Sequence, residues 1–362
     1  MTLQSAKKML FNYSQNFILF LKLAWKMFNA SHSYGTYHRY VRRIARETIR
    51  HSLILNDGSI PERIFKKIRW YMVEAVIMGE LLADLTDNPI KEKDRESLIY
   101  LGAIMALFDV IVDDFRLDRE NINKLLYNTF SQAKLTLTDD ITAIEKVYYL
   151  YLDKLRGTLE KEHWNIISDH IGMIKMQIKS NEQYSEDISE ETVTSITIGK
   201  GGVSALICSA FLQQKSDSFS KAVYELGGFI QMMNDCQDIH KDTVAGIKTF
   251  VHFSRDFGEV FNRLNEQRIK SFQFIKTLEY SHDGRRRCLF DLNTMFIVIA
   301  YKLQRYAETC NYRLDFGAIA EMNSMDFRIN PFSPNTVSEC FWNILRFTYK
   351  NCESTPVFKY KS

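Results

Sequence analysis

Apolar residues recur every three to four positions along most of this chain, the spacing that places them on one face of an α-helix. The stripe is clearest between residues 62 and 84, where Ile64, Ile68 and Met72 are separated by polar positions. The pattern predicts further helices at 7–30, 34–52, 92–116, 121–134, 139–160, 162–182, 189–214, 217–243, 250–279, 284–311 and 335–349. It therefore predicts an all-α protein, and the nearly unbroken apolar run at 98–112 indicates a central, buried helix.

The placement of proline agrees with a long helical bundle. All five prolines lie at or outside positions 89 and 331, so no proline interrupts the residues between them. Proline breaks helix interiors, and a β-rich domain of this length would use it in turns and edge strands. We expect a single bundle of about ten helices over 56–350, with a helical extension at 1–55 and a loose tail at 351–362.

Charge and cysteine content exclude some function classes. The net charge is +3 with both signs mixed along the chain, whereas nucleic-acid binding needs a concentrated basic face. The six cysteines form no CxxC pair, which indicates reduced thiols and a cytoplasmic protein. The apolar run at 17–28 contains Lys22 and Lys26 and is too short to span a membrane. It predicts an amphipathic helix, and packing on the protein body and weak contact with a membrane surface both remain open.

The first candidate site is the segment FDVIVDDF at 108–115. Asp109 and Asp113 are four residues apart and project from one face of a helix, with Asp114 about 100° further round. Asp109 follows a run of apolar residues, where an unpaired carboxylate is costly to bury. A metal cation would relieve the repulsion between these acids. A solvated helix end with scattered acids is the alternative interpretation.

A second acidic row occurs in GGFIQMMNDCQDIHKD at 227–242. Asn234, Asp238 and Asp242 are spaced i, i+4, i+8 along one helical face, and Asp235 lies at the edge of that face. Carboxylate and amide oxygens without thiolates suit a hard cation such as Mg²⁺. A solvated acidic face is again the alternative, but two such rows on two apolar helices make it weaker.

Magnesium held by few protein oxygens completes its coordination with water and phosphate, and phosphate is bound by lysine and arginine. Lys200 lies in IGKGG at 198–202, where two glycines are expected to interrupt the helix and expose backbone amides to an anion. Lys248, Arg305 and Tyr306 are the other candidates for diphosphate contacts. Each cation by itself is more often a solvated surface residue.

Together these segments resemble the class I isoprenoid (terpene) synthase superfamily. GGFIQMMNDCQDIHKD is similar to the second metal motif of that superfamily, with Asp238 and Asp242 where cyclases carry Ser or Thr and Glu. FDVIVDDF resembles the first aspartate-rich motif, and Lys200 and the Arg305–Tyr306 pair resemble conserved cations and an RY pair. The resemblance implies a central active-site cavity and a prenyl diphosphate substrate. It also implies three Mg²⁺ ions, replaceable by Mn²⁺, held by Asp109, Asp113, Asp114, Asn234, Asp235, Asp238 and Asp242.

Chain-elongating prenyltransferases carry paired arginines for a second substrate shortly after the first aspartates, whereas the segment after Asp114 reads FRLDRENI and has none. This favours a terpene cyclase, in which Lys200, Lys248, Arg305 and Tyr306 bind the departing diphosphate. A chain-elongating or squalene-type prenyltransferase and a non-catalytic helical scaffold remain alternatives, and a homodimer is compatible with all of them. Aromatic residues such as Phe108, Phe229, Phe296 and Tyr301 are candidate walls for the carbocation cavity.

Overall fold

The computed structural model describes residues 54–113, 141–160, 172–212, 216–327 and 334–345, and a few isolated positions (14, 17–18, 43–44, 47, 52 and 163). Its α-helices are α2 Glu62–Thr86, α3 Glu92–Asp113, α5 Ala143–Thr158, α7 Gly172–Lys179, α8 Glu190–Cys208, α9 Asp217–Gln237, α10 Ile239–Ala245, α11 Phe257–Thr277, α12 His282–Thr309, α13 Phe316–Glu321 and α14 Pro334–Leu345. Short 3-10 helices cover Ser180–Tyr184, Ser209–Phe211, Phe250–Phe253 and Ser324–Phe327. These segments contain no strand, which confirms the all-α prediction. The helices predicted at 7–30, 34–52 and 121–134 and the tail from 351 lie largely or wholly outside the described residues.

Local sequence explains where the central helices begin. Ser189, Ser216, Asp256 and Ser281 precede α8, α9, α11 and α12, and each accepts a hydrogen bond from the backbone N–H three residues later. These are the residue types that best satisfy the free N–H groups at a helix start. Gly246 ends α10 in the left-handed conformation, with a φ of 70°.

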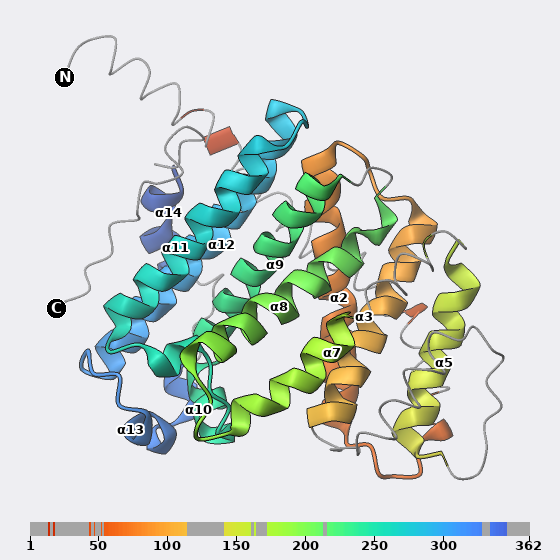
Figure 1. Ribbon diagram of the computed structural model, residues 1–362, viewed down its shortest axis with the longest axis horizontal. Helices are drawn as coiled ribbons and strands as arrows, with labels where there is room; N and C mark the ends of the chain where they lie inside the picture. Colours follow the sequence, from red (N-terminus) through yellow and green to blue (C-terminus); the bar gives the residue numbers. More distant parts are fainter. Residues whose placement is uncertain are drawn as a thin grey trace.

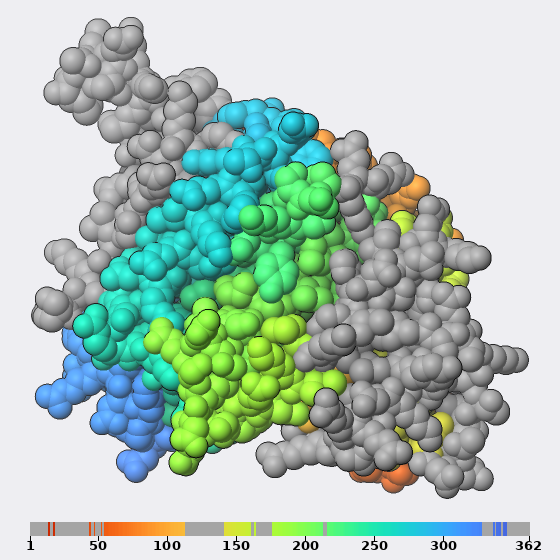
Figure 2. All heavy atoms as spheres, viewed as in Figure 1, coloured from red at the N-terminus to blue at the C-terminus, as the bar shows by residue number. Residues whose placement is uncertain are grey.

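The helices form one bundle, with α8 and α9 across its middle (Figure 1). The pair α2 and α3 lies on one side of α8 and α9, with α5 beyond α3, and α11 and α12 lie on the other side. α7 contacts both α3 and α8. In Figure 2 the surfaces of α7, α8 and α11 come together over one face of the bundle. The expected buried helix is α3, whose residues 98–112 are buried except for Met105 and Asp109, which are half-buried.

Two glycine contacts set how closely the central helices approach. A Cβ on Gly102 of α3 would lie 2.4 Å from the backbone oxygen of Tyr71 on α2. A Cβ on Gly201 of α8 would lie 2.1 Å from the backbone oxygen of Gly227 on α9. The expected helix interruption at IGKGG is therefore wrong: α8 runs unbroken through Gly201 and Gly202. The glycines allow α9 to approach, and their amides remain within the helix.

Two other helix predictions need correction. The predicted helix at 217–243 is divided at Asp238, whose φ of −96° and ψ of 12° end α9 before α10 begins. The predicted helix at 250–279 begins as a 3-10 turn, and α11 starts only after Asp256. The six-residue helix α13 was not predicted, because it is too short to show a periodic pattern.

The aromatic residues predicted to line a cavity are mostly packed in the core. Phe229 is fully buried and its ring meets Phe272 and Phe296 at centroid distances of 6.2 Å each. Phe108 and Phe296 are also buried, and Tyr301 is half-buried. Phe108, Phe229 and Phe296 are therefore enclosed in the core, and the rings of Phe229 and Phe296 pack against other phenylalanine rings.

One stretch of the described chain, Glu190–Phe211, is long and apolar enough to cross a membrane. Most of it is buried inside the bundle, where the same composition serves as core.

Candidate active site

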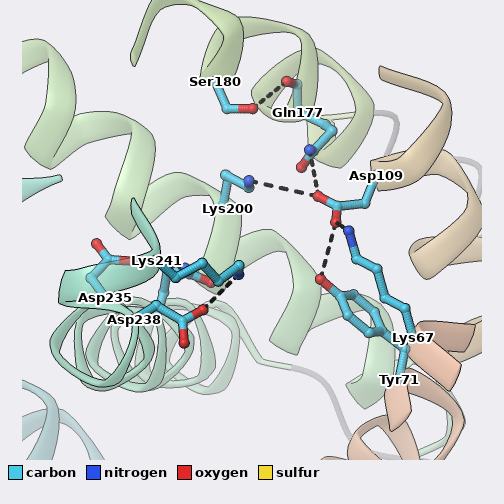
Figure 3. A network of polar contacts seen from close by, with 10 residues as sticks. Lys67, Tyr71, Asp109, Gln177, Ser180, Lys200, Asp235, Asp238 and Lys241 are labelled. Atoms are coloured by element: carbon cyan, nitrogen blue, oxygen red, sulfur yellow. Dashed lines mark hydrogen bonds and ion pairs between the residues drawn. The ribbon is translucent and has the colours of Figure 1, made fainter. Parts of the chain in front are cut away.

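The carboxylate of Asp109 on α3 is the centre of a network of polar contacts (Figure 3). Its Oδ1 accepts a hydrogen bond from Gln177 Nε2 at 2.6 Å and lies 3.9 Å from Lys200 Nζ. Its Oδ2 accepts a hydrogen bond from the Tyr71 hydroxyl at 3.3 Å and forms a close ion pair with Lys67. α2, α7 and α8 thus each contribute a partner to one carboxylate.

The helix packing explains this convergence. Lys67 and Tyr71 are one turn apart on α2, so both side chains lie on the face that Gly102 brings against α3. Burial raises the pKa of Asp109, but the charges of Lys200 and Lys67 outweigh burial and hold the pKa below its ordinary value. Asp109 is therefore ionised, and its charge is compensated by lysine.

The acidic residues of the second segment have a different electrostatic environment. Asp235 is buried and accepts hydrogen bonds from Thr197 Oγ1 and Gln231 Nε2, each at 3.0 Å. Burial raises the pKa of Asp235 to about 6. Asp242 is also buried, and burial followed by repulsion from Asp235 and Asp238 raises its pKa to about 8. These carboxylates repel one another, and the surrounding lysines compensate their charge only partly.

Asp238 lies between these two acids in the sequence and is partly accessible. Its Oδ2 accepts from Lys241 Nζ at 2.8 Å, and 30% of its side chain is exposed. Burial lowers the pKa of Lys241, but Asp238, Asp242 and Asp109 together raise it above its ordinary value. Lys241 therefore extends between the two acidic segments, as Figure 3 shows. We call Lys67, Lys200 and Lys241 the lysine cluster.

Lys200 connects both acidic segments. Besides its ion pair with Asp109, its charge lowers the pKa of Asp235 and of Asp242. The structure thus brings Lys200 together with Asp109, Asp235 and Asp242, which are far apart in the sequence.

The chemistry of the second segment fits a divalent cation. Asp235, Asp238 and Asp242 offer hard oxygen donors, and their mutual repulsion would be relieved by a metal. No group of three or more His, Cys, Asp or Glu is already arranged as a metal cage among the described side chains. That set omits the side chain of Asp113 and all of Asp114.

The other predicted residues have different surroundings. Asn234 is exposed on α9. Lys248 Nζ donates to the backbone oxygen of Glu186 at 2.7 Å. Arg305 pairs with Glu308 at 2.5 Å and its side chain is 54% exposed. Tyr306 is buried and its hydroxyl donates to the Phe327 backbone oxygen at 2.5 Å. Burial, and after it the charge of Asp238, raises the pKa of Tyr306.

Several residues of the site were not singled out from the sequence. Lys67, Tyr71, Gln177 and Lys241 carry no distinguishing motif, and only the i, i+4 spacing of Lys67 and Tyr71 offered a signal. On α12, the buried Lys302 donates to Gln237 Oε1 at 3.1 Å, one turn from Tyr306.

Glu74 on α2 extends the site away from the lysine cluster. Its side chain is exposed, yet the surrounding protein withdraws enough water to raise its pKa to about 7, and the charge of Asp238 adds to this effect. Trp70 hydrogen-bonds to Glu74, and Trp70 and Ile77 lie on the same helical face, 55% and 45% exposed. Two exposed apolar residues, Trp70 and Ile77, therefore flank Glu74 along α2.

Comparisons with known proteins give limited information. No protein-family model matches the chain, and no curated protein is significantly similar to it. Among solved structures, a geranyltransferase from Legionella pneumophila aligns over 73% of this chain and 98% of its own, with 15% identity and a TM-score of 0.38. Likeness at this level establishes neither a shared fold nor a shared activity.

Proposed function

We propose that this protein is a Mg²⁺-dependent class I terpene synthase, which ionises a linear prenyl diphosphate and cyclises the resulting carbocation. The observation that carries the proposal is the position of Lys200. Its cation pairs with Asp109 of the first acidic segment and acts on Asp235 and Asp242 of the second. The site places lysines and carboxylates close together. Lysines bind phosphate oxygens and carboxylates bind metal ions, so such a site suits a diphosphate that binds together with Mg²⁺.

In this proposal the metal ligands are Asp238, Asp242, Asn234 and Asp235 in the second segment, and Asp113 and Asp114 of the first segment. When bound, Mg²⁺ would act as a Lewis acid that stabilises the charge on the departing diphosphate. Loss of repulsion among Asp235, Asp238 and Asp242 would favour its binding.

The lysine cluster would donate hydrogen bonds to the diphosphate oxygens and so orient the leaving group. Lys67, Lys200 and Lys241 keep 33%, 24% and 73% of their side chains exposed, and each ammonium has three donors, so each can donate to a phosphate oxygen while its carboxylate partner stays in place. Arg305 and Lys248 would contribute only after leaving Glu308 and the Glu186 carbonyl. Trp70 would present its ring to the carbocation.

The decisive experiment is incubation of the purified protein and Mg²⁺ with each prenyl diphosphate from C10 to C25, followed by gas chromatography with mass detection. We expect a cyclic hydrocarbon or alcohol from a single substrate. Longer prenyl diphosphates formed only with added isopentenyl diphosphate would instead establish a chain-elongating prenyltransferase. A doubled carbon count from farnesyl diphosphate would establish the squalene-type reaction, and no turnover of any substrate would favour the scaffold.

Two variants show whether turnover depends on the site. Asp242→Asn should abolish it, and Lys200→Met should lower kcat/KM at least tenfold, which corresponds to about 1.4 kcal/mol of transition-state stabilisation. Both should keep the helical far-UV circular dichroism spectrum. Full activity in either variant would contradict the proposed site.

A further inference from the structure

The contacts of Asp109 differ from those expected of a metal ligand. An ionised carboxylate has about four acceptor directions on its two oxygens. In Asp109, Oδ1 faces Gln177 and Lys200, and Oδ2 faces Tyr71 and Lys67. A metal ion at this carboxylate would meet three close donors and, 3.9 Å from Oδ1, the ammonium of Lys200, which would repel it.

The balance of charge points the same way. The Lys200 ammonium lies 3.9 Å from Oδ1 of Asp109, and the Lys67 ammonium forms a close ion pair with Oδ2. Two ammonium groups share this one carboxylate, which by itself compensates only one of their two charges. Each ammonium has three donors, and both side chains are partly exposed. The pair of lysines is thus prepared to bind an anion.

We infer that Asp109 is a positioning residue that holds Lys67 and Lys200 as a metal-independent anchor for one phosphate group, and that it is not a ligand of Mg²⁺. The inference rests on the proposed function, because it assumes a diphosphate at the same site. It departs from the sequence-based expectation, in which Asp109 is the first metal ligand. It also assigns a phosphate contact to Lys67.

The helices that carry these groups explain why the anchor forms. Lys67 and Tyr71 come from α2, Gln177 from α7 and Lys200 from α8, while Asp109 extends from the buried face of α3. Figure 3 shows the four side chains converging on the Asp109 carboxylate. Holding two flexible lysines in advance reduces the conformational entropy lost when an anion binds.

The test is calorimetric titration of the full-length protein with inorganic diphosphate in EDTA, without any divalent metal. Lys67→Met should raise the Kd about tenfold or more. Its matched control is Lys66→Met, because Lys66 is the neighbouring lysine, 66% exposed and paired with Glu62 at 3.1 Å. The control should stay within about twofold of wild type. Equal effects of the two variants, or no binding by wild type without metal, would overturn the anchor.

A second titration separates positioning from metal binding. With saturating diphosphate, Asp109→Asn should leave the Mg²⁺ midpoint within about twofold of wild type, while Asp242→Asn should raise it at least tenfold. In the Asp109→Asn background, Lys67→Met should raise the metal-free Kd by less than about threefold, because Lys67 is no longer held in place. A Mg²⁺ midpoint of Asp109→Asn as high as that of Asp242→Asn would refute the inference. Additive effects of Asp109→Asn and Lys67→Met on the metal-free Kd of the double variant would also refute it.

These outcomes distinguish the two proposals. If wild type binds diphosphate only together with Mg²⁺, the anchor is wrong and the terpene synthase proposal stands. If wild type binds diphosphate neither with nor without Mg²⁺, both fall.

Discussion

The acidic side chains of the site differ in how their charge is compensated. Asp109 has two lysine partners and a lowered pKa, whereas Asp235 and Asp242 have raised pKa values of about 6 and about 8. Burial raises the pKa of all three carboxyl groups. At Asp109 the charges of Lys200 and Lys67 outweigh burial, whereas at Asp242 the charges of Asp235 and Asp238 add to it. In the metal-free protein, repulsion therefore concentrates at the second acidic segment.

The first prediction concerns the pH dependence of stability without metal. The pKa of Asp242 is about 8 in the folded protein and 3.8 ordinarily, so the folded state retains a proton that the unfolded state releases. The free energy of unfolding should therefore fall as pH rises from about 4 to 8. Asp242→Asn removes this loss and should raise the Tm at pH 8 by about 2 °C or more, with little change at pH 4.

Thermal unfolding in EDTA at several pH values measures this effect. Asp153→Asn, on the exposed side of α5, serves as the control and should leave the pH profile unchanged. If the Tm of Asp242→Asn at pH 8 equals that of wild type or lies below it, the raised pKa of Asp242 is wrong.

A second prediction at this scale concerns Trp70, whose ring is 55% exposed beside Glu74. If the ring faces the carbocation, Trp70→Ala should lower kcat about fivefold or more, because cation–π attraction contributes about 0.5–2 kcal/mol. Trp70→Phe keeps an aromatic face and should retain most of the activity. Steady-state kinetics and product profiles compare the two, and equal activity of Ala and Phe variants would exclude a role for the ring.

At the scale of elements, α8 is the helix that joins both acidic segments. It carries Thr197 against Asp235 and Lys200 against Asp109, and its most extensive partner is α9. The close crossing at Gly201 and Gly227 determines the depth at which these side chains lie. A substitution that separates α8 from α9 at this crossing should therefore lower the stability of the protein and also displace the side chains of the site.

Gly201→Ala tests this relation. The added Cβ would meet the Gly227 backbone oxygen at 2.1 Å, and a backbone neighbour cannot move aside cheaply. We expect a loss of about 1–3 kcal/mol or more in the free energy of unfolding. Gly157→Ala is the matched control, because Gly157 is exposed on α5 with nothing within 4 Å of the new Cβ. It should stabilise the protein by up to about 1 kcal/mol. Urea unfolding measures both, and equal effects would refute the role of the crossing.

At the scale of the whole molecule, the bundle collects the site from helices distant in sequence. α2, α3, α7, α8 and the α9–α10 junction all contribute polar groups, and α12 adds Lys302 beside Gln237. A ligand that bridges these helices should stabilise the entire bundle, because it binds only when they are packed together.

Mg²⁺ and inorganic diphosphate together should therefore raise the Tm of wild type. At concentrations a hundredfold above Kd the expected gain is about 2.7 kcal/mol, or several degrees. Mg²⁺ alone should give a smaller shift, and Asp242→Asn should lose most of the joint effect. Differential scanning fluorimetry measures these shifts. No response to the pair in wild type would favour a non-catalytic scaffold.

The sequence by itself determined the helical architecture, since the 3.6-residue apolar period and the absence of proline between 90 and 330 depend on local chemistry. It also singled out Lys200 and the two acidic segments, because runs of acids on apolar helices are visible without coordinates. Tertiary structure alone decided that Lys67, Tyr71 and Gln177 surround Asp109, that α8 passes unbroken through IGKGG, and that Arg305 pairs with Glu308. These features depend on which helices cross and how closely. Such crossings bring together side chains that are far apart in the sequence, 68 residues for Asp109 and Gln177 and 200 for Asp87 and Arg287, and no local pattern reports them.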